Sequence, residues 1–244
     1  MSIPAAPLNA PRLVAVCDVL GFSDLVTANP TELVVENAVG WLRKALKHSV
    51  VGGSFPEAAP PTKDLETNPD VSMAWFSDTI LFYTRHDTDG AVSELIQVVA
   101  SLLFETILEG STKIRAGIAY GDVHVDVENS IYVGRPIIEA HRMEKCQEWA
   151  GAALTESACG RLNSCGPGGE IARWWTKKWD VPLKGGRTVE ALAVNWNHCV
   201  HDPGWRLRWS PEHDTPPAGA PEGVVAKFWN TKRFHEAHCD DCRK

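Results

Sequence analysis

The sequence predicts an α+β protein, in which helices cover a mixed, mainly antiparallel sheet. Two observations lead to this prediction. Strand-like segments occur in pairs joined by short turns, and segments with helical periodicity lie between these pairs. With 244 residues, 44% of them hydrophobic, the chain can form one large domain with an ordinary core.

Composition excludes several classes of protein. A formal net charge of −7 argues against a protein that coats nucleic acid or an acidic membrane surface. No apolar run reaches the roughly 18 residues of a membrane span, and the first residues lack the basic and apolar regions of a signal peptide. Seven cysteines without a repeating framework fit a reduced compartment. We therefore expect a cytoplasmic protein with no nucleic-acid or membrane partner.

The first strand is expected in the apolar segment LVAVC, which ends at Asp18 and follows a loose leader over residues 1–11. A glycine-containing turn comes next, and a helix should begin after it. The Asp18 carboxylate is a candidate metal ligand, and the amides of residues 19–23 are candidates for binding phosphate at the helix N-terminus. A purely structural strand-turn-helix unit explains the stretch equally well.

The next elements are a helix, a loop and a hairpin. Apolar side chains recur at helical spacing over residues 31–48, and residues 52–70 are rich in Pro, Gly and Thr. Residues 71–85 predict a β-hairpin whose tight turn contains Asp78. A polar turn residue is the simple explanation of Asp78. The functional one is a second carboxylate near Asp18.

Residues 91–108 predict a long helix with one buried stripe. A strand follows over 113–120 and is expected to break at Gly121. Residues 122–128 then alternate between acidic or His side chains and valines. This alternation favours a solvated strand face over a metal site, because a half-buried strand produces it directly.

The third group of elements begins with a helix expected over residues 136–149, with Pro in its first turn. Ile138 and Arg142 are one turn apart and therefore share a face of this helix. A short strand is expected at 152–155, and two closing strands within 174–195. Helices that alternate with hairpins in this way indicate the α+β class.

Four ordered segments, VCDVLGFS, FSDTILF, IRAGIAYG and YVGRPIIEAHRME, resemble the catalytic domains of class III nucleotidyl cyclases. The resemblance spans roughly residues 13–195, so we expect a catalytic domain at 12–195. It implies a ferredoxin-like core and a reaction in which the 3′-hydroxyl of a nucleoside triphosphate attacks its α-phosphorus and pyrophosphate leaves. Two divalent ions, Mn²⁺ or Mg²⁺, assist such a displacement.

The resemblance also assigns roles to residues. It makes Asp18 and Asp78 the metal ligands, together with the backbone of Val19. Arg142 corresponds to the arginine that stabilises the transition state, and a surface arginine is the alternative. Lys184 corresponds to a triphosphate-binding lysine, or is an exposed turn lysine. The residues expected to bind phosphate through their amides are Leu20, Gly21, Phe22 and Ser23.

Departures from the family pattern concern the nucleobase. Adenylate cyclases have a lysine where this chain has Ala74, and a base-selecting Asp or Thr near Ile131. The usual transition-state asparagine is replaced by Ile138. The residues that read a purine are therefore absent, and we expect an apolar base pocket formed by Ala74, Phe76 and Ile131.

This combination looks like the pyrimidine cyclases of bacterial anti-phage (Pycsar) systems, which make cyclic UMP or cyclic CMP to activate a separate effector protein. The resemblance favours UTP over CTP as substrate and implies a homodimer with active sites at the interface. Two alternatives remain open: a purine cyclase, adenylate or guanylate, and a degenerate domain that binds nucleotide or dimerises without turnover.

Residues 196–244 differ in composition and form a His-, Cys- and Trp-rich appendage. Cys239 and Cys242, with His235 and His238 before them, resemble half of a zinc site. One such pair without a second is weak support for zinc. We therefore expect a tail that lies against the catalytic domain rather than a bound metal.

Overall fold

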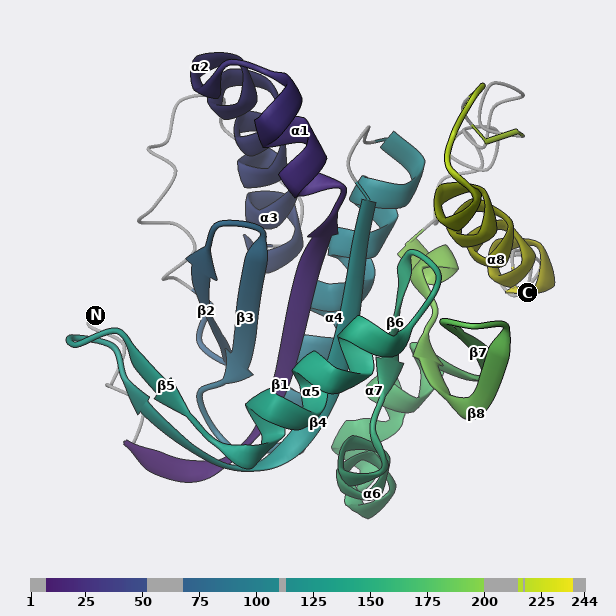
Figure 1. Ribbon diagram of the computed structural model, residues 1–244. Coiled ribbons are helices and arrows are strands. Elements are labelled where there is room, and N and C mark those ends of the chain that lie inside the picture. Colours follow the sequence, from purple (N-terminus) through teal and green to yellow (C-terminus); the bar gives the residue numbers. More distant parts are fainter. Residues whose placement is uncertain (1–7, 52–67, 110–112, 200–214, 217, 239–244) are drawn as a thin grey trace.

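The fold was obtained as a computed structural model, and the structure describes residues 8–51, 68–109, 113–199, 215, 216 and 218–238 (Figure 1). The strands are β1 (Asn9–Leu20), β2 (Val71–Phe76), β3 (Thr79–Thr84), β4 (Lys113–Asp126), β5 (Ile131–Val133), β6 (Gly151–Leu154), β7 (Thr176–Leu183) and β8 (Arg187–Val194). The α-helices are α1 (Phe22–Ala28), α2 (Thr31–Leu33), α3 (Gly40–Val51), α4 (Asp89–Phe104), α5 (Arg135–Cys146), α6 (Glu156–Ser164), α7 (Glu170–Trp174) and α8 (Glu222–His238). Short π-helical and 3₁₀ segments are η1 (Val34–Val39), η2 (Glu105–Glu109), η3 (Pro167–Gly169) and η4 (Trp196–Cys199).

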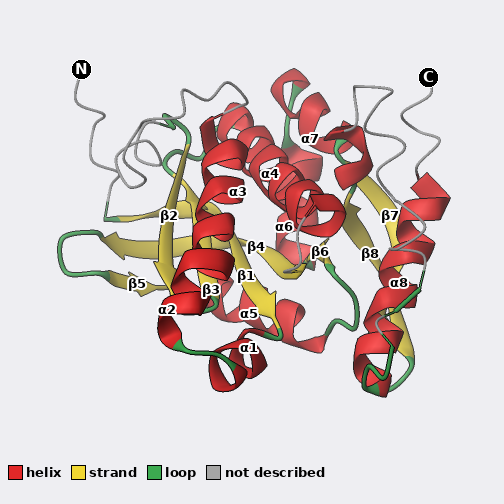
Figure 2. Ribbon diagram, turned by 90° about the horizontal axis from the view of Figure 1, so that it is seen from above, coloured by secondary structure: helices red, strands yellow, loops and turns green. Residues whose placement is uncertain are grey.

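The strands form one sheet in the order β2-β3-β1-β4-β6-β8-β7, with β5 paired to β4. The β4–β6 pair is parallel, and the other pairs between these strands are antiparallel. Helices cover both faces of the sheet: α3 and α4 lie on one face and α5 on the other (Figure 2). The predicted α+β class with a mixed, mainly antiparallel sheet is confirmed.

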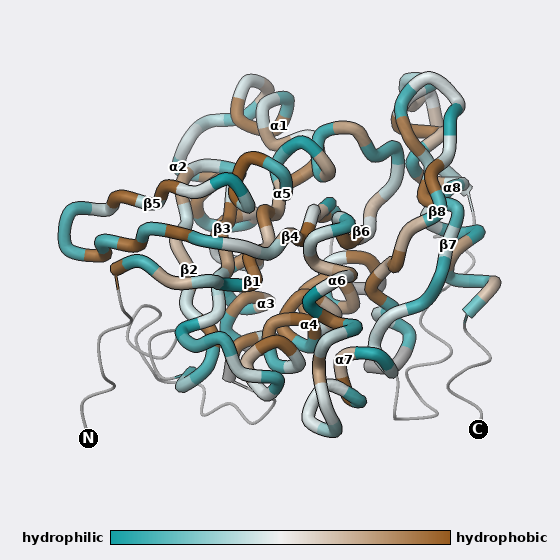
Figure 3. The backbone as a smooth tube through the Cα atoms, turned by 90° about the horizontal axis from the view of Figure 1, so that it is seen from below, coloured by the Kyte–Doolittle hydropathy of each residue, from teal (hydrophilic) through white to brown (hydrophobic). Residues whose placement is uncertain are grey.

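Strand β1 is central because its two faces belong to two different cores. The face toward α4 carries Leu13, Ala15, Cys17 and Val19, which join the larger core. The opposite face carries Val14 and Val16, which join a smaller core with side chains of β3, β4 and α5. Figure 3 shows the resulting concentration of hydrophobic residues in the central strands and α4. By alternation, Asp18 follows Val14 and Val16 and lies on the α5 face.

The helical stretch from Asp89 to Ile107 is long and apolar enough, by composition, to cross a membrane. In this structure 72% of its most apolar window is buried inside the protein. Thr88 caps its start by accepting a hydrogen bond from the Ala91 amide. This stretch is the core helix of the domain. The sequence predicted one buried stripe over residues 91–108, but side chains on nearly all faces of α4 are buried.

Several boundaries differ from the sequence prediction. Strand β1 begins at Asn9, within the segment expected to be a leader. Gly121 does not end the strand that contains it: β4 continues through it to Asp126 with φ of 149° at that glycine. Helix α5 ends at Cys146, three residues early, because Trp149 turns into the core instead. Helix α6 had no counterpart in the prediction. The expected 52–70 loop lies mostly outside the described residues.

Candidate active site

One row of residues crosses the sheet at the end of β1. Asp18 pairs with Thr79 on β3 and with Arg115 on β4, and Thr79 pairs with Phe76 on β2. Directly opposed residues on neighbouring strands share a face, so all four point toward the α5 side. Asp18 thus lies at the carboxyl end of a buried strand, with Thr79 of β3 on one side and the cationic Arg115 of β4 on the other.

Two cations contact the Asp18 carboxylate, which is only 8% exposed. Lys145 Nζ donates to Asp18 Oδ1 at 2.9 Å, and Arg115 Nη2 lies 3.6 Å from Asp18 Oδ2. Partial burial acts to lower the pKa of Lys145, but its hydrogen bond to Asp18 and the nearby carboxylates outweigh that effect and raise the pKa. The ammonium group therefore stays charged and forms an ion pair with Asp18.

Glu144 completes this charged cluster from inside α5, where its side chain is fully buried. Arg115 Nε donates to Glu144 Oε1 at 2.7 Å, and Arg115 Nη1 donates to the Gln147 carbonyl at 2.9 Å. Burial raises the pKa of Glu144, against the opposing effect of Arg115. The second oxygen, Oε2, is buried. In the described part of the chain it accepts no hydrogen bond, and the cation nearest to it is Lys145 Nζ at 3.6 Å.

A close approach of α5 to the sheet makes these contacts possible. A Cβ atom at Gly117 of β4 would lie 2.1 Å from the Ala140 carbonyl oxygen of α5. Any side chain there would push the helix away and separate Lys145 and Glu144 from Asp18 and Arg115. Gly117, the first of the two glycines in the IRAGIAYG segment, therefore serves the site by letting the helix and strand backbones come into contact.

Asp78 occupies the turn between β2 and β3, after Ser77 in the left-handed conformation with φ of 57°. The Val19 amide donates to the Asp78 carbonyl at 3.0 Å, which fixes the turn beside the end of β1. No hydrogen bond or ion pair engages the half-buried Asp78 side chain within the described part of the chain. The structure thus brings together the two aspartates and the Val19 backbone that the sequence singled out.

These groups fit divalent ions. Carboxylate and carbonyl oxygens are the ligands that Mg²⁺ and Mn²⁺ prefer, and the Lys145 ammonium already occupies a cation position against Asp18. Among the described residues, no cluster of three or more His, Cys, Asp or Glu side chains could hold a metal. Substrate oxygens would therefore have to supply much of the coordination.

Arg142 projects from the exposed side of α5, with Ile138 one turn before it and 54% exposed. Within the described residues, no hydrogen bond or ion pair to its side chain is present. Arg142 lines an open hollow of about 690 Å³ with Arg135, Met143, Glu156 and other side chains of α5 and α6. The predicted shared face of Ile138 and Arg142 is consistent with this helix, whose next turn carries Lys145.

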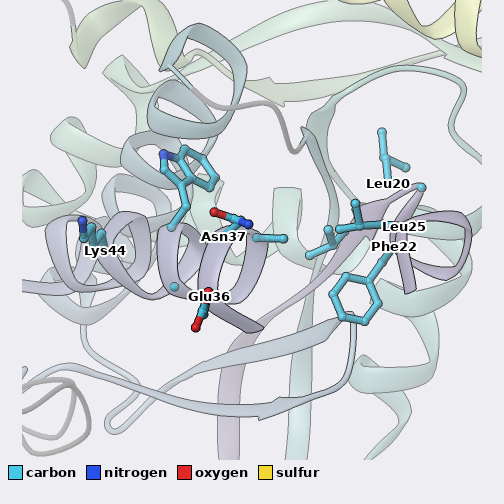
Figure 4. A pocket seen from close by; sticks show the side chains of 11 residues that line it. Leu20, Phe22, Leu25, Glu36, Asn37 and Lys44 are labelled. Carbon is cyan, nitrogen blue, oxygen red and sulfur yellow. The ribbon is translucent and has the colours of Figure 1, made fainter. Parts of the chain in front are cut away.

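The turn after Asp18 borders a cavity of about 610 Å³ between β1, α1 and α3 (Figure 4). Gly21, with φ of 77°, permits the tight turn into α1. Of the residues expected to bind phosphate, Leu20, Gly21 and Phe22 line the cavity with Val19, and Ser23 lies in the first turn of α1. Glu36, Asn37 and Lys44 face it from the neighbouring helices.

Lys184 lies in the exposed turn between β7 and β8. Its backbone amide donates to the Cys146 carbonyl at 2.9 Å, which ties this turn to the end of α5. The turn therefore lies beside the end of α5, one helical turn beyond Arg142. The side chain itself is solvent-exposed.

The expected base pocket is only partly assembled within one chain. Ala74 and Phe76 lie on the Asp18 face of β2, and Phe76 is 85% exposed. They do not share a strand with Asp78, which belongs to the turn. Ile131 pairs with Asp126 at the far end of β4, on the opposite face. Its neighbour Tyr132 faces the Asp18 side instead and packs against Tyr83, with ring centroids 5.9 Å apart.

The fold resembles several solved structures. The catalytic core of a rhodopsin-guanylyl cyclase with converted specificity, in complex with ATPαS, superimposes with a TM-score of 0.53 at 15% identity, covering 75% of this chain and 94% of that one. The monomeric guanylyl cyclase domain of the RhoGC fusion protein from the aquatic fungus Blastocladiella emersonii gives 0.53 at 15% identity, covering 78% and 98%. The chain has the class III nucleotidyl cyclase fold.

Adenylate cyclases from Trypanosoma brucei in their monomeric state give a TM-score of 0.51 at 14% identity, covering 80% of this chain and 94% of that one. No protein-family model and no curated protein sequence matches the chain. At such low identity the similarity establishes the fold, so the predicted class III cyclase fold is confirmed, while the residues of the site have to be judged by their own geometry.

Sequence reasoning missed Arg115, Glu144 and Lys145. Arg115 is in the IRAGIAYG segment, where a charged residue within an apolar strand signals a partner. Glu144 is the last residue of the YVGRPIIEAHRME segment and Lys145 follows it. Their partners, Arg115 and Asp18, are about 30 and 127 positions away in sequence. Only the fold shows that they meet Asp18.

The His/Cys-rich segment serves packing where it is described. Phe234 and His238 of α8 make edge-to-face contacts with Trp179, and Phe234 also contacts Trp149 and Trp196. Burial lowers the pKa of His235 to about 4. Cys239 and Cys242 lie outside the described residues, so the possible zinc pair is not seen there.

Proposed function

We propose that this protein is a nucleotidyl cyclase that converts a nucleoside triphosphate to the 3′,5′-cyclic monophosphate and pyrophosphate. The observation that supports it most strongly is the meeting of Asp18 with the Asp78 turn at the end of β1, within the fold of a class III cyclase. A carboxylate placed there, beside the Asp78 turn, suits metal-assisted displacement at phosphorus.

Each residue has a proposed role. Asp18, Asp78 and the Val19 backbone would hold two divalent ions, Mn²⁺ or Mg²⁺, which would supply positive charge at the phosphates and activate the hydroxyl. Amides of the turn at residues 20–23 would hold the outer phosphates, as the adjoining cavity suggests. Arg142 would stabilise the charge that develops at the α-phosphorus.

The exposed position of Arg142 supports a homodimer in which each site uses residues of two copies. Large apolar side chains are exposed on the β4–β5 hairpin, at the end of β2 and on α5: Phe76, Val127, Ile131, Val133 and Ile138, each at least 44% exposed. Phe76 and Ile138 are on the α5 side of the sheet, where such exposure is typical of an interface. Burying these two side chains in a two-fold dimer would give two equivalent sites and would bring Arg142 of one copy to the aspartates of the other.

For the nucleobase we propose a pyrimidine, with UTP favoured over CTP. Ala74 and Phe76, on the Asp18 face of β2, offer no charged group to read a purine edge, and apolar bulk suits a smaller base. A purine cyclase is equally compatible with the similar solved structures, which are guanylyl and adenylyl cyclases. A cytoplasmic second messenger in anti-phage signalling, read by a separate effector, extends this proposal on the basis of the sequence resemblance alone.

The experiment that tests the proposal is incubation with ATP, GTP, CTP and UTP in the presence of Mn²⁺, followed by mass analysis of the products. We expect a cyclic monophosphate and pyrophosphate, with cyclic UMP dominant. Cyclic AMP or cyclic GMP as the main product would retain the cyclase and reject the pyrimidine assignment. Nucleotide binding without any cyclic product would favour the degenerate binding module.

A further inference from the structure

The charged cluster of Asp18, Arg115, Glu144 and Lys145 contains two acids and two bases and is therefore electrically balanced. Three of its side chains are nearly inaccessible, with exposed fractions of 11% for Asp18, 4% for Arg115 and 0% for Glu144. Lys145 differs, because its side chain is 46% exposed. The Lys145 ammonium group can therefore change position while it stays in contact with water.

Lys145 also has a second acceptor within reach. Its Nζ atom is 2.9 Å from Asp18 Oδ1 and 3.6 Å from Glu144 Oε2. Glu144 Oε2 is buried and accepts no hydrogen bond from any described residue, which is a costly state for a carboxylate oxygen. A small shift of Nζ away from Asp18 would bring it to hydrogen-bond distance from that oxygen.

We propose that Lys145 is a positioning residue that acts as an exchangeable counter-ion of Asp18: it opposes divalent metal binding on its own and moves to Glu144 Oε2 when metal and triphosphate bind together. This inference rests on the proposed function. Lys145 and Arg115 place two positive charges beside the Asp18 carboxylate. A divalent cation added there gains little net attraction, because the Asp18 charge is already balanced and Lys145 has to be displaced, whereas a metal–triphosphate complex brings its own negative charge.

The arrangement has a consequence for the order of binding. Metal ions alone should occupy the site weakly, and a nucleoside triphosphate should increase their affinity strongly. By linkage, the metal should increase nucleotide affinity by the same factor. Removing the Lys145 charge should uncouple the two ligands, because Asp18 would then attract the metal without help from phosphate.

The test is a titration of Mn²⁺ followed by electron paramagnetic resonance, which detects the free ion and needs no turnover. Wild-type protein is compared with Lys145→Met and Lys145→Arg, with and without 3′-deoxyuridine or 3′-deoxyadenosine triphosphate, which cannot cyclise. Lys178→Met, at an exposed position of β7, is the matched control. Circular dichroism melting of each variant checks that it is folded.

Without nucleotide, we expect Lys145→Met to bind Mn²⁺ at least about tenfold more tightly than wild type, and Lys145→Arg and Lys178→Met to remain near wild type. With nucleotide, the advantage of Lys145→Met should shrink. Unchanged or weakened Mn²⁺ binding by folded Lys145→Met overturns the inference while leaving the proposed function intact. Failure of wild type and Lys145→Met alike to bind Mn²⁺, even with nucleotide, overturns both.

Discussion

Two neighbouring clusters of side chains both contact Gln147, and they differ in the interactions that hold them together. The charged cluster around Asp18 is built from ion pairs between β1, β4 and α5, whereas the aromatic cluster of Trp149, Trp196 and Phe234 joins the domain to α8. Gln147 accepts from Arg115 through its carbonyl and from Trp149 Nε1 through its side chain at 2.6 Å. One residue thus belongs to both.

The difference shows which cluster serves chemistry and which serves stability. Buried ion pairs contribute little net stability, because desolvation offsets their attraction. Aromatic side chains bury large apolar areas at little such cost, and Phe234 is fully buried. Figure 1 shows α8, in yellow-green, beside the β7–β8 hairpin. We therefore expect substitutions in the charged cluster to change activity most, and those in the aromatic cluster to change stability most.

The strongest test of this contrast is Asp18→Asn, with Asp78→Asn as its companion. Each substitution removes a proposed metal ligand, so turnover of the nucleotide should fall at least about 10³-fold. The free energy of unfolding of Asp18→Asn should change by no more than about 1 kcal/mol, because the half-exposed Lys145 can return to solvent. Product formation by mass analysis and urea unfolding measure the two quantities. A variant that loses several kcal/mol of stability but keeps its activity would contradict this assignment of the charged cluster to chemistry.

The same variant also tests whether a site is shared between copies. Asp18→Asn mixed with Arg142→Ala at equal amounts should form mixed dimers in half of the molecules, each with one intact and one doubly altered site. Activity should return to about a quarter of wild type. If each site is complete within one chain, the mixture stays inactive.

Phe234→Ala tests the aromatic cluster. Its ring contacts Trp149, Trp179 and Trp196, with centroids between 4.5 and 5.2 Å away, so truncation should lower the free energy of unfolding by about 4 kcal/mol. Turnover by the fraction that remains folded should be near wild type. Trp229→Ala, on the exposed side of α8, is the matched control and should cost about 1 kcal/mol or less. Equal losses in both variants would mean that α8 packs elsewhere.

Glu144→Met tests how much a residue of the charged cluster contributes to stability as well as to activity. Methionine preserves the volume, but Arg115 loses its nearest carboxylate and remains buried with Asp18 at 3.6 Å and the Gln147 carbonyl. We expect a loss of about 3 kcal/mol in the free energy of unfolding, together with lower activity. Glu144→Gln, which still accepts a hydrogen bond from Arg115 Nε, should recover part of the stability. A Glu144→Met protein as stable as wild type would show that the pair contributes no net stability.

The sequence was sufficient for the parts of the site that depend on local pattern. The apolar run that ends at Asp18 and the tight turn at Asp78 are local features, and both have the predicted elements around them. The contacts of Lys145 with Asp18 are not local, since they depend on how closely α5 lies on β4 at Gly117. Ile131 illustrates the same limit: its place in the hairpin follows from the pattern, but the register that turns it away from the Asp18 face does not.

The last expected effect is a pH dependence of stability that appears only in acid and comes from His235, which follows Phe234 in α8. Burial lowers the pKa of His235 to about 4, from about 6.5 in an unfolded chain. Between these values the unfolded chain takes up a proton and the folded one does not, so stability is complete above pH 6.5 and falls as the pH decreases toward 4. The loss at pH 4 should reach up to about 3 kcal/mol.

His235→Leu should remove this part of the pH dependence, measured as the free energy of unfolding between pH 4 and pH 7. His86→Gln, altered at an exposed position, is the control and should follow the wild-type curve. Parallel curves for wild type and His235→Leu would mean that His235 is hydrated in solution and that α8 is only loosely attached. A wild-type curve steeper than that of His235→Leu would show that the C-terminal helix unfolds together with the catalytic domain. A proton would then bind His235 only when both unfold.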